Sequence, residues 1–356
     1  PGYSRSGIWF GDRGGRVAVA KGVRSQKRGA YLWSPVERSE AHALDAIGPG
    51  QHIVFTGTDG LQHSFEYQRH AEHEDGSWTW VGRLPGEPGQ ETIITFGDRA
   101  VFGSIAQGGD APNLRLTTRD GRPWLVEADA GELATLAKWF TDPEESDARL
   151  PLPHAPRGAA GMRAKAGGQI LPEAQTSTTI DVLVGFTSGF AQGLGGTSQA
   201  QTRINHLIEV GNQAHLNAET GVQLRIVHAM SVNYADATSN NKTLDALTGV
   251  DSDRKVYVDP DPAFADLRAA RETYKADLVT VLRKFNAPEN DSCGVAWLNG
   301  GGGTAIIPED DEFYGYSVVS DGSDVDESDD KTYFCRDEAL VHELGHNLGS
   351  THDKSA

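Results

Sequence analysis

The residues best suited to chemistry form the run His-Glu-Leu-Gly-His that begins at His342 of this 356-residue chain. His342 and His346 are four positions apart, so on a helix both rings project from one face and can share a metal ion. Glu343, beside the first histidine, would reach a water molecule at that metal and take its proton. This spacing predicts a catalytic zinc site carried by a helix.

A third ligand is predicted from the glycine that follows the helix. Gly349 can adopt a left-handed conformation and turn the chain back toward the metal, which would bring His352 to the site. Three protein ligands and one open position for water are the arrangement of hydrolytic zinc sites. The expected chemistry is hydrolysis by a zinc-bound water that Glu343 activates.

Apolar periodicity predicts the elements that must position this helix within an α/β catalytic domain of residues 179–356. Because strands and helices alternate, we expect a mixed twisted sheet. The strands are expected at 180–186, 222–232, 277–283, 294–298 and 316–320, and the helices at 197–217 and 262–274.

The preceding residues predict a different architecture. Residues 1–141 contain short apolar runs separated by turn residues, which indicates a mostly β N-terminal domain. Residues 142–178 are rich in proline, glycine and charge, which indicates a linker with a processing site. Asp-Gly pairs favour tight hairpin turns, and three of them occur in the β domain, at Asp59, Asp75 and Asp120.

The complete pattern His-Glu-x-x-His-x-x-Gly-x-x-His, from His342 to His352, resembles the signature of the metzincin zinc metallopeptidases. Asp353, directly after it, is similar to the adamalysin, or reprolysin, branch. The resemblance covers about residues 178–353. It implies that His342, His346 and His352 bind zinc.

In this family Glu343 would be the general base, and Gly349 and Asp353 would belong to the turn that follows the helix. The reaction implied by the resemblance is the hydrolysis of peptide bonds in protein or peptide substrates. An endopeptidase of this kind needs one catalytic Zn²⁺ as cofactor.

The strands before the helix extend the resemblance. Residues 277–282 look like the family's central strand, 294–298 like its edge strand and 316–319 like the strand beyond. The resemblance implies that the edge strand binds an extended peptide by strand addition. The expected substrate-binding residues are Gly294, Val295, Ala296 and Trp297.

The chain has two cysteines, Cys293 and Cys335. They are either two separate buried thiols or one disulfide, and a single bridge would fit an oxidising compartment. We favour the disulfide because it would tie the start of the edge strand to the start of the histidine helix. This preference agrees with a secreted, extracellular protein.

The sequence departs from the family after the third histidine. Metzincins carry a methionine-containing turn there, whereas Met162 and Met230 both precede the histidines and the sequence reaches only Ala356. We therefore expect residues 179–356 to be the upper catalytic subdomain alone, with the Met-turn and the lower subdomain absent.

The N-terminal half resembles a propeptide of secreted bacterial metallopeptidase precursors, in position and in the stretches 102–104 and 122–127. Such a propeptide would act as an intramolecular inhibitor and make the chain a zymogen. Residues 1–141 contain no cysteine that could block zinc, and a carboxylate could take its place. Asp12 and Asp98, each in a Phe-Gly-Asp sequence, are the latency candidates, although both could be ordinary turn aspartates.

Charge and composition exclude other classes. A formal net charge of −18 repels nucleic acid phosphates, and the sequence has no stretch of about 18 apolar residues that would span a membrane. The acidic run 321–330 could bind Ca²⁺, but it lacks the spacing of a known calcium loop, and a solvated acidic loop is the simpler interpretation.

Two rival functions stay open at this point. The first is a zinc-binding but catalytically incomplete module whose β domain binds a protein partner, against which the intact Glu343 argues. The second is a thermolysin-type enzyme, which would need a downstream glutamate as third ligand and is made unnecessary by His352.

Overall fold

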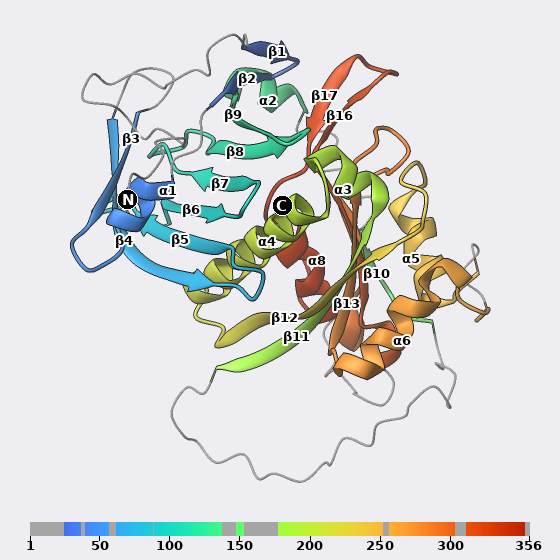
Figure 1. Ribbon diagram of the computed structural model, residues 1–356. Coiled ribbons are helices and arrows are strands. Elements are labelled where there is room, and N and C mark those ends of the chain that lie inside the picture. Colours follow the sequence, from blue (N-terminus) through green and yellow to red (C-terminus); the bar gives the residue numbers. More distant parts are fainter. Residues whose placement is uncertain are drawn as a thin grey trace. The chain divides into compact units, whose positions relative to one another are not determined.

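The structure is a computed structural model that describes residues 25–36, 40–56, 62–87, 89–136, 147–152, 177–251, 256–302 and 311–352 (Figure 1). The chain divides into two compact units. The N-terminal unit contains Pro1–Phe140, Ala191–Glu209 and Asp329–Tyr333. The C-terminal unit contains Thr141–Phe190, Val210–Ser328 and Phe334–Ala356.

A nine-stranded antiparallel sheet forms most of the N-terminal unit, with the strand order β1-β2-β9-β8-β7-β6-β5-β4-β3. Most neighbours in the sheet are also neighbours in sequence, as in a meander. The strands are β1 (Gln26–Arg28), β2 (Tyr31–Pro35), β3 (His52–Thr56), β4 (Gln62–Glu72), β5 (Trp78–Arg83), β6 (Glu91–Phe96), β7 (Val101–Ile105), β8 (Leu114–Arg119) and β9 (Arg122–Ala128), with the helices α1 (Glu40–Asp45) and α2 (Ala130–Leu136).

Alternating apolar side chains of this sheet bury a core that includes Phe65, Trp80 and Ile94, each with no exposed surface. The predicted turn between β8 and β9 is confirmed, because Asp120 and Gly121 both have positive φ angles of 49° and 69°. This is the combination that a tight turn between twisted antiparallel strands requires.

A six-stranded mixed sheet forms the centre of the C-terminal unit, in the order β10-β14-β15-β13-β11-β12. Only β14 and β15 are antiparallel; the other neighbours are parallel. The strands are β10 (Ala148–Arg149), β11 (Thr178–Thr187), β12 (Val222–Val232), β13 (Leu278–Lys284), β14 (Gly294–Trp297) and β15 (Tyr316–Asp321), followed along the chain by β16 (Ser323–Asp326) and β17 (Lys331–Phe334).

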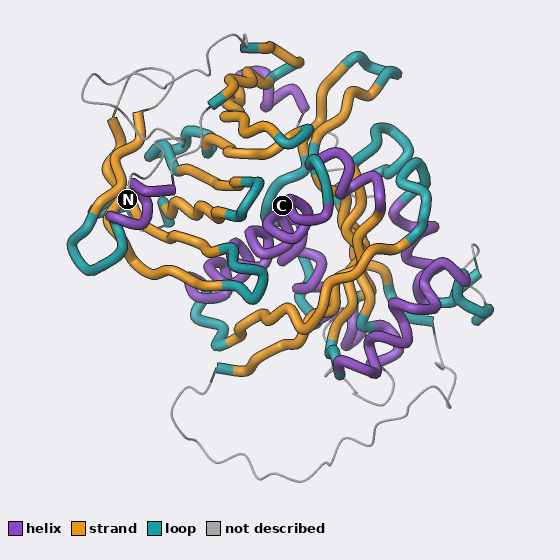
Figure 2. Tube along the Cα trace, in the orientation of Figure 1, coloured by secondary structure: helices purple, strands orange, loops and turns teal. Residues whose placement is uncertain are grey.

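Helices lie on both faces of the mixed sheet (Figure 2). The face with α5 and α6 carries the apolar core of Leu244, Leu267, Val281 and Trp297. The helices along the chain are α3 (Ser188–Leu194), α4 (Thr197–Asn217), α5 (Asn240–Thr248), α6 (Ala265–Tyr274) and α8 (Ala339–Asn347), with 3-10 turns at Pro262–Phe264, Asn299–Gly302 and Glu312–Tyr314.

These elements confirm the expected fold class, a mostly β region followed by an α/β region with a mixed sheet. The long helix predicted at 197–217 and the strand predicted at 222–232 have the same bounds in the structure. Other elements of the C-terminal half differ from the expectation. The helices α3 and α5 and the strands β16 and β17 were not predicted, and β10 lies inside the segment that was interpreted as a linker.

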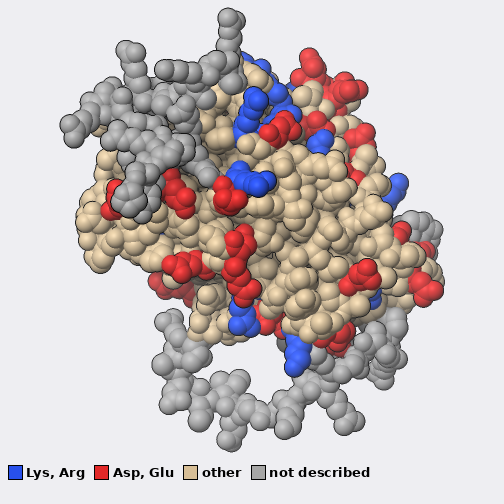
Figure 3. All heavy atoms as spheres, viewed as in Figure 1, with Lys and Arg blue, Asp and Glu red and all other residues tan. Residues whose placement is uncertain are grey.

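None of the helices that the structure describes is both long enough and apolar enough to cross a membrane. Acidic side chains are spread over the face drawn in Figure 3, in keeping with the formal net charge of −18.

Candidate metal centre

Helix α8 is fixed to the sheet through Asn347, which is 2% exposed. Its side-chain amide donates hydrogen bonds to the carbonyl oxygens of Trp297 at 2.9 Å, Tyr316 at 3.1 Å and Tyr314 at 3.3 Å. The Asn299 side chain in turn donates to the Asn347 carbonyl at 2.9 Å. The end of α8 is therefore held against β14 and β15 at the point where the histidines project.

The chain turns back directly after this helix, as the sequence predicts for Gly349. The φ angle of Gly349 is 88°, which lies in the left-handed region. The backbone N–H groups of Gly349 and Ser350 donate to the carbonyls of His346 and Gly345, each at 2.9 Å. This turn returns the chain so that His352 lies beside the helical histidines.

Three imidazole rings converge at one point. The Nε2 atom of His342 lies 3.1 Å from Nε2 of His346 and 3.0 Å from Nε2 of His352. The ring of His346 is buried, with 2% of its side chain exposed, whereas those of His342 and His352 are 43% and 44% exposed. The cluster is therefore open to solvent on one side and closed by protein on the other.

The protonation of His346 fits a metal ligand. Its Nδ1 atom lies 2.8 Å from the carbonyl oxygen of Ser350. A carbonyl oxygen only accepts hydrogen bonds, so Nδ1 donates here, and Nε2, which faces the cluster, is the nitrogen left to bind a metal ion. Backbone contacts of this kind orient histidine ligands of zinc. The donor set suits zinc because imidazole nitrogen and carboxylate oxygen are both zinc ligands.

A fourth group, the Asp147 carboxylate, completes the cluster. Its oxygens lie 3.1 Å from Nε2 of His342, 3.3 Å from Nε2 of His346 and 2.9 Å from Nε2 of His352. One ligand atom from each of the four residues falls within 4.8 Å of all the others. Burial disfavours the charged form of Asp147, but the contacts with His342 and His346 outweigh it and hold the pKa of this carboxyl well below its usual range.

Glu343 lies buried beside the cluster, with 2% of its surface exposed. Burial, and then the charge of Asp147, raise the pKa of Glu343 well above its usual value. Its Oε2 atom has no hydrogen-bond partner among the described residues. Gly294 on β14 packs against it, and the missing side chain of that glycine leaves room for the carboxylate. The site thus contains a buried carboxyl group, one oxygen of which has no described hydrogen-bond partner, beside the cluster of Asp147 and the three histidines.

The expected substrate-binding strand β14 is already paired on both sides. Its four residues are buried, and β15 lies antiparallel on one side. On the other side β10 runs parallel, with Ala148 opposite Ala296 and Arg149 opposite Trp297. The N–H groups of Ala296 and Leu298 donate to the carbonyls of Asp147 at 2.9 Å and of Arg149 at 2.7 Å. Residues 147–149 thus occupy the edge expected to take a peptide.

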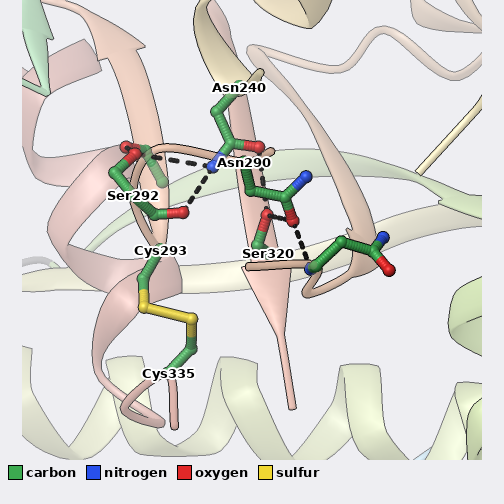
Figure 4. Close-up of a disulfide and its surroundings, with 8 residues drawn as sticks. Asn240, Asn290, Ser292, Cys293, Ser320 and Cys335 are labelled. Carbon is green, nitrogen blue, oxygen red and sulfur yellow. Dashed lines mark hydrogen bonds between the residues drawn. A yellow bond between two sulfur atoms is a disulfide. The ribbon is translucent and has the colours of Figure 1, made fainter. Parts of the chain in front are cut away.

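The predicted disulfide between Cys293 and Cys335 is present, with Cα atoms 5.4 Å apart (Figure 4). It joins the residue before β14 to the loop before α8. Asn240 supports the same corner, because its amide donates to the Ser292 carbonyl at 2.7 Å and its oxygen accepts from the Ser320 hydroxyl at 3.0 Å. The residue before β14 and the loop before the histidine helix are therefore linked by a covalent bond.

Among the aspartates predicted from the sequence as site residues, only Asp98 lies within the described residues, and it is not part of this cluster. Asp12 and Asp353 lie outside the described residues. Asp98 belongs to the N-terminal unit, where its side chain is 84% exposed and lies 3.5 Å from the side chain of Arg99. Asp147 was missed because 195 positions separate it from His342 and no spacing rule connects them.

The acidic run 321–330 offers no cluster comparable with that of the histidines. In the described part of the chain, only Asp147 and the three histidines group as three or more metal-binding residues. Asp326 accepts from the N–H of Ser328 at 2.8 Å, and Asp329 accepts from the hydroxyl of Tyr333 at 2.6 Å. Calcium binding therefore stays a prediction.

Comparisons with known proteins agree with this geometry. The family model for metallo-peptidases of family M12B, reprolysin-like, matches residues 176–356, just over half of the chain. The peptidyl-Asp metalloendopeptidase of Pseudomonas aeruginosa is 26% identical over 178 residues, which are 49% of this chain and 25% of that protein. The chain thus spans about a quarter of the length of that curated relative.

Two solved structures also match. Metalloproteinase-II from Bacteroides fragilis is matched over 88% of this chain and 85% of its own, with 10% identity and a TM-score of 0.44. A structure described as a chaperone–substrate complex is matched over 71% of this chain and 31% of its own, with 16% identity and a TM-score of 0.35. The family match includes all three histidines, and Asp147 precedes it.

Proposed function

The chain belongs to the reprolysin-like metallo-peptidases of family M12B, and from this premise we propose that it is a zinc-dependent endopeptidase made as a latent, secreted precursor. One observation carries the proposal. Three histidine Nε2 atoms converge on one point beside the buried Glu343, whose Oε2 atom has no described hydrogen-bond partner. Protein or peptide chains are the proposed substrates.

His342, His346 and His352 would hold the zinc ion. When bound, zinc supplies Lewis-acid chemistry, which polarises a peptide carbonyl and makes water more acidic. The protein contributes the arrangement of the ligands. His346 is oriented by its contact with the Ser350 carbonyl at 2.8 Å, and the turn at Gly349 supports His352. Calcium would be at most an accessory ion at the acidic run 321–330.

Glu343 would act as the general base. Its position next to His342 in the sequence, and the burial and the Asp147 charge that together raise its pKa, support this role. We propose that it accepts the proton of the attacking water and passes it to the leaving amine. A positioned base of this kind contributes roughly 10² to 10⁴ in rate.

The substrate would bind as an added strand on β14. Residues 147–149 illustrate this mode, since backbone N–H groups of Ala296 and Leu298 bind the carbonyls of Asp147 and Arg149. Strand addition uses main-chain hydrogen bonds, so it accepts many sequences in an extended conformation. The buried residues Gly294–Trp297 supply this edge.

The same contacts support latency. Asp147 lies against all three histidines, and β10 covers the edge of β14. We propose that Asp147 is the carboxylate that keeps the precursor inactive. Asp12 and Asp98 stay as the alternatives predicted from the sequence. Secretion is supported by the disulfide, because such bonds persist in oxidising compartments.

The test combines metal analysis with a peptidase assay on the full chain, before and after limited proteolysis. We expect about one equivalent of zinc and cleavage of casein after proteolysis. Glu343→Gln should keep the zinc and lose activity, whereas His346→Gln should lose both. Zinc well below about half an equivalent in the intact protein, or casein cleavage unchanged in Glu343→Gln, would disprove the proposal.

A further inference from the structure

Arg149 is a charged side chain on the segment that covers β14, yet only 5% of it is exposed. Its Nη1 atom lies 3.1 Å from Oδ1 of Asp245 and donates to the Asn241 carbonyl at 3.0 Å. Its guanidinium carbon lies 5.6 Å from the centre of the Trp297 ring. The side chain thus lies buried among Asn241 and Asp245 of α5 and Trp297 of β14, and these three residues are called the Arg149 pocket below.

This pocket is built for a cation. The side chain of Asp245 is 8% exposed, and a carboxylate buried to that extent strongly favours a positive partner. Trp297 offers the face of an indole ring, the best aromatic partner for a guanidinium. The indole is fixed by a hydrogen bond from its Nε1 to the Thr248 hydroxyl at 2.8 Å.

The pocket lies along the proposed peptide-binding edge. Arg149 is opposite Trp297, and its carbonyl accepts from the N–H of Leu298 at 2.7 Å. Side chains of a strand alternate between its two faces. A peptide residue at the position of Arg149 would therefore extend toward α5, and the residue at the position of Ala148, opposite Ala296, would extend toward the other face of the sheet.

We propose that Asp245, Trp297 and the Asn241 carbonyl form a specificity site for an arginine or lysine side chain of the substrate. In the latent chain Arg149 occupies this site. The inference rests on the proposed peptidase function and adds a preference to it. Release of residues 147–149 removes the cation that lies 3.1 Å from Asp245 in the latent chain, and a basic substrate residue replaces it.

The test measures binding, so that it does not depend on cleavage. The full chain carries Glu343→Ala to prevent hydrolysis, with Asp147→Ala and Arg149→Ala to weaken the segment that covers β14. Limited proteolysis on both sides of residues 147–149 then frees the edge, because the backbone hydrogen bonds of this segment do not depend on its side chains. Two fluorescent peptides differ only in one residue, arginine or its neutral analogue citrulline, placed in turn along an extended sequence. At one position we expect the arginine peptide to bind at least about tenfold more tightly.

Asp245→Asn in the same background should reduce this difference to less than about twofold while the citrulline peptide binds as before. Asp266→Asn, the same charge change at an exposed position of α6, is the matched control and should retain the preference. Because the arginine–citrulline comparison uses an unaltered pocket, it stays decisive even if Asp245→Asn fails to fold.

The outcomes separate the two proposals. Peptides that bind without any preference for arginine, at every position, overturn the specificity site and leave the peptidase function standing. If no peptide binds at all, both the proposed binding of substrates on β14 and the proposed specificity site are wrong. In the activated enzyme, the preference should appear in KM, because a pocket away from the cleaved bond contributes uniform binding.

Discussion

Gly294 and Glu343 pack so closely that a Cβ atom on residue 294 would lie 2.4 Å from Oε1 of the carboxylate. Gly294→Ala must therefore displace Glu343, the group that would receive a proton. We expect activity of the processed enzyme to fall by at least about 100-fold with zinc content unchanged. The stability cost should be about 1–3 kcal/mol, as for other overpacked sites.

The control for this substitution is Gly193→Ala in α3, where an added Cβ atom would meet nothing within 4 Å. Metal analysis and casein hydrolysis of both variants are the measurements. Full activity in Gly294→Ala would show that Glu343 does not need its observed position.

Asp147 should limit both the activity and the metal exchange of the intact precursor. Asp147→Ala removes a carboxylate from the histidine cluster, so we expect casein cleavage without prior proteolysis. Zinc affinity, measured by competition with a chelator, should fall by about tenfold or more. The visible spectrum of the cobalt-substituted protein should also change, because one ligand is lost.

Asp266→Asn, at an exposed position of α6, serves as the control for charge. The latency role of Asp147 is wrong if Asp147→Ala stays inactive, keeps its cobalt spectrum and binds zinc as the unaltered chain does. Activity gained instead by Asp98→Ala would favour the aspartate predicted from the sequence.

Asn347 should matter for the stability of the C-terminal unit. Its side-chain amide donates hydrogen bonds to three carbonyl oxygens, those of Trp297, Tyr314 and Tyr316. Asn347→Ala leaves these buried acceptors without that donor, which costs about 1–3 kcal/mol. Thermal unfolding should shift down by about 2–4 °C for each kcal/mol. Asn286→Ala, which loses one exposed bond to the Lys284 carbonyl, should shift it much less.

The disulfide should stabilise the same unit. Cys293 and Cys335 are separated by 42 positions, and closing a loop of that size contributes at most about 4 kcal/mol in the chain-entropy model. The double variant Cys293→Ser/Cys335→Ser should unfold at a lower urea concentration than the oxidised protein. A reducing agent should produce the same shift in the unaltered chain and none in the variant.

The stability of the N-terminal unit should depend on pH through His73. Burial lowers the pKa of His73 below its ordinary value of 6.5, more than the nearby Glu209 and Asp75 raise it, and Arg69 lowers it further. The unfolded chain therefore binds a proton that the folded chain does not, and stability falls as the pH drops through that value. Above it the contribution is constant.

The measurement is urea unfolding of the N-terminal unit by tryptophan fluorescence at about pH 7.5 and about pH 5.5. The unaltered chain should lose more stability between these conditions than His73→Gln, which cannot titrate. His52→Gln, at an exposed position of β3, should behave like the unaltered chain. Equal losses in His73→Gln and the unaltered chain would rule out this residue as the cause.

The elements that could be predicted from the sequence are those whose own residues show a clear apolar pattern. Helix 197–217 has long amphipathic periodicity, and the strand that became β11 is a strongly apolar run, so local pattern was sufficient. The histidine spacing, likewise, is a property of one helix and its turn. The disulfide needed the context of both elements but could be inferred because the chain has only two cysteines.

The parts that were missed depend on distant partners. Strand β10 is two residues long and is a strand only because β14 lies beside it. Asp147 has no feature that separates it from its acidic neighbours until the fold brings it to the histidines. Helix α5 begins with two asparagines, poor helix formers, and is started by the side chain of Ser239, which accepts from the N–H of Lys242.

Asp147 and Arg149 lie on one short segment that remains covalently joined to the rest of the chain. A tethered ligand experiences an effective concentration of the order of millimolar, so weak contacts suffice to keep it bound. A single cut on one side of the segment leaves the other tether and therefore much of this advantage. Cuts on both sides turn it into a dilute free peptide, whose rebinding is governed by its bulk concentration, so activation by two cuts is in effect irreversible.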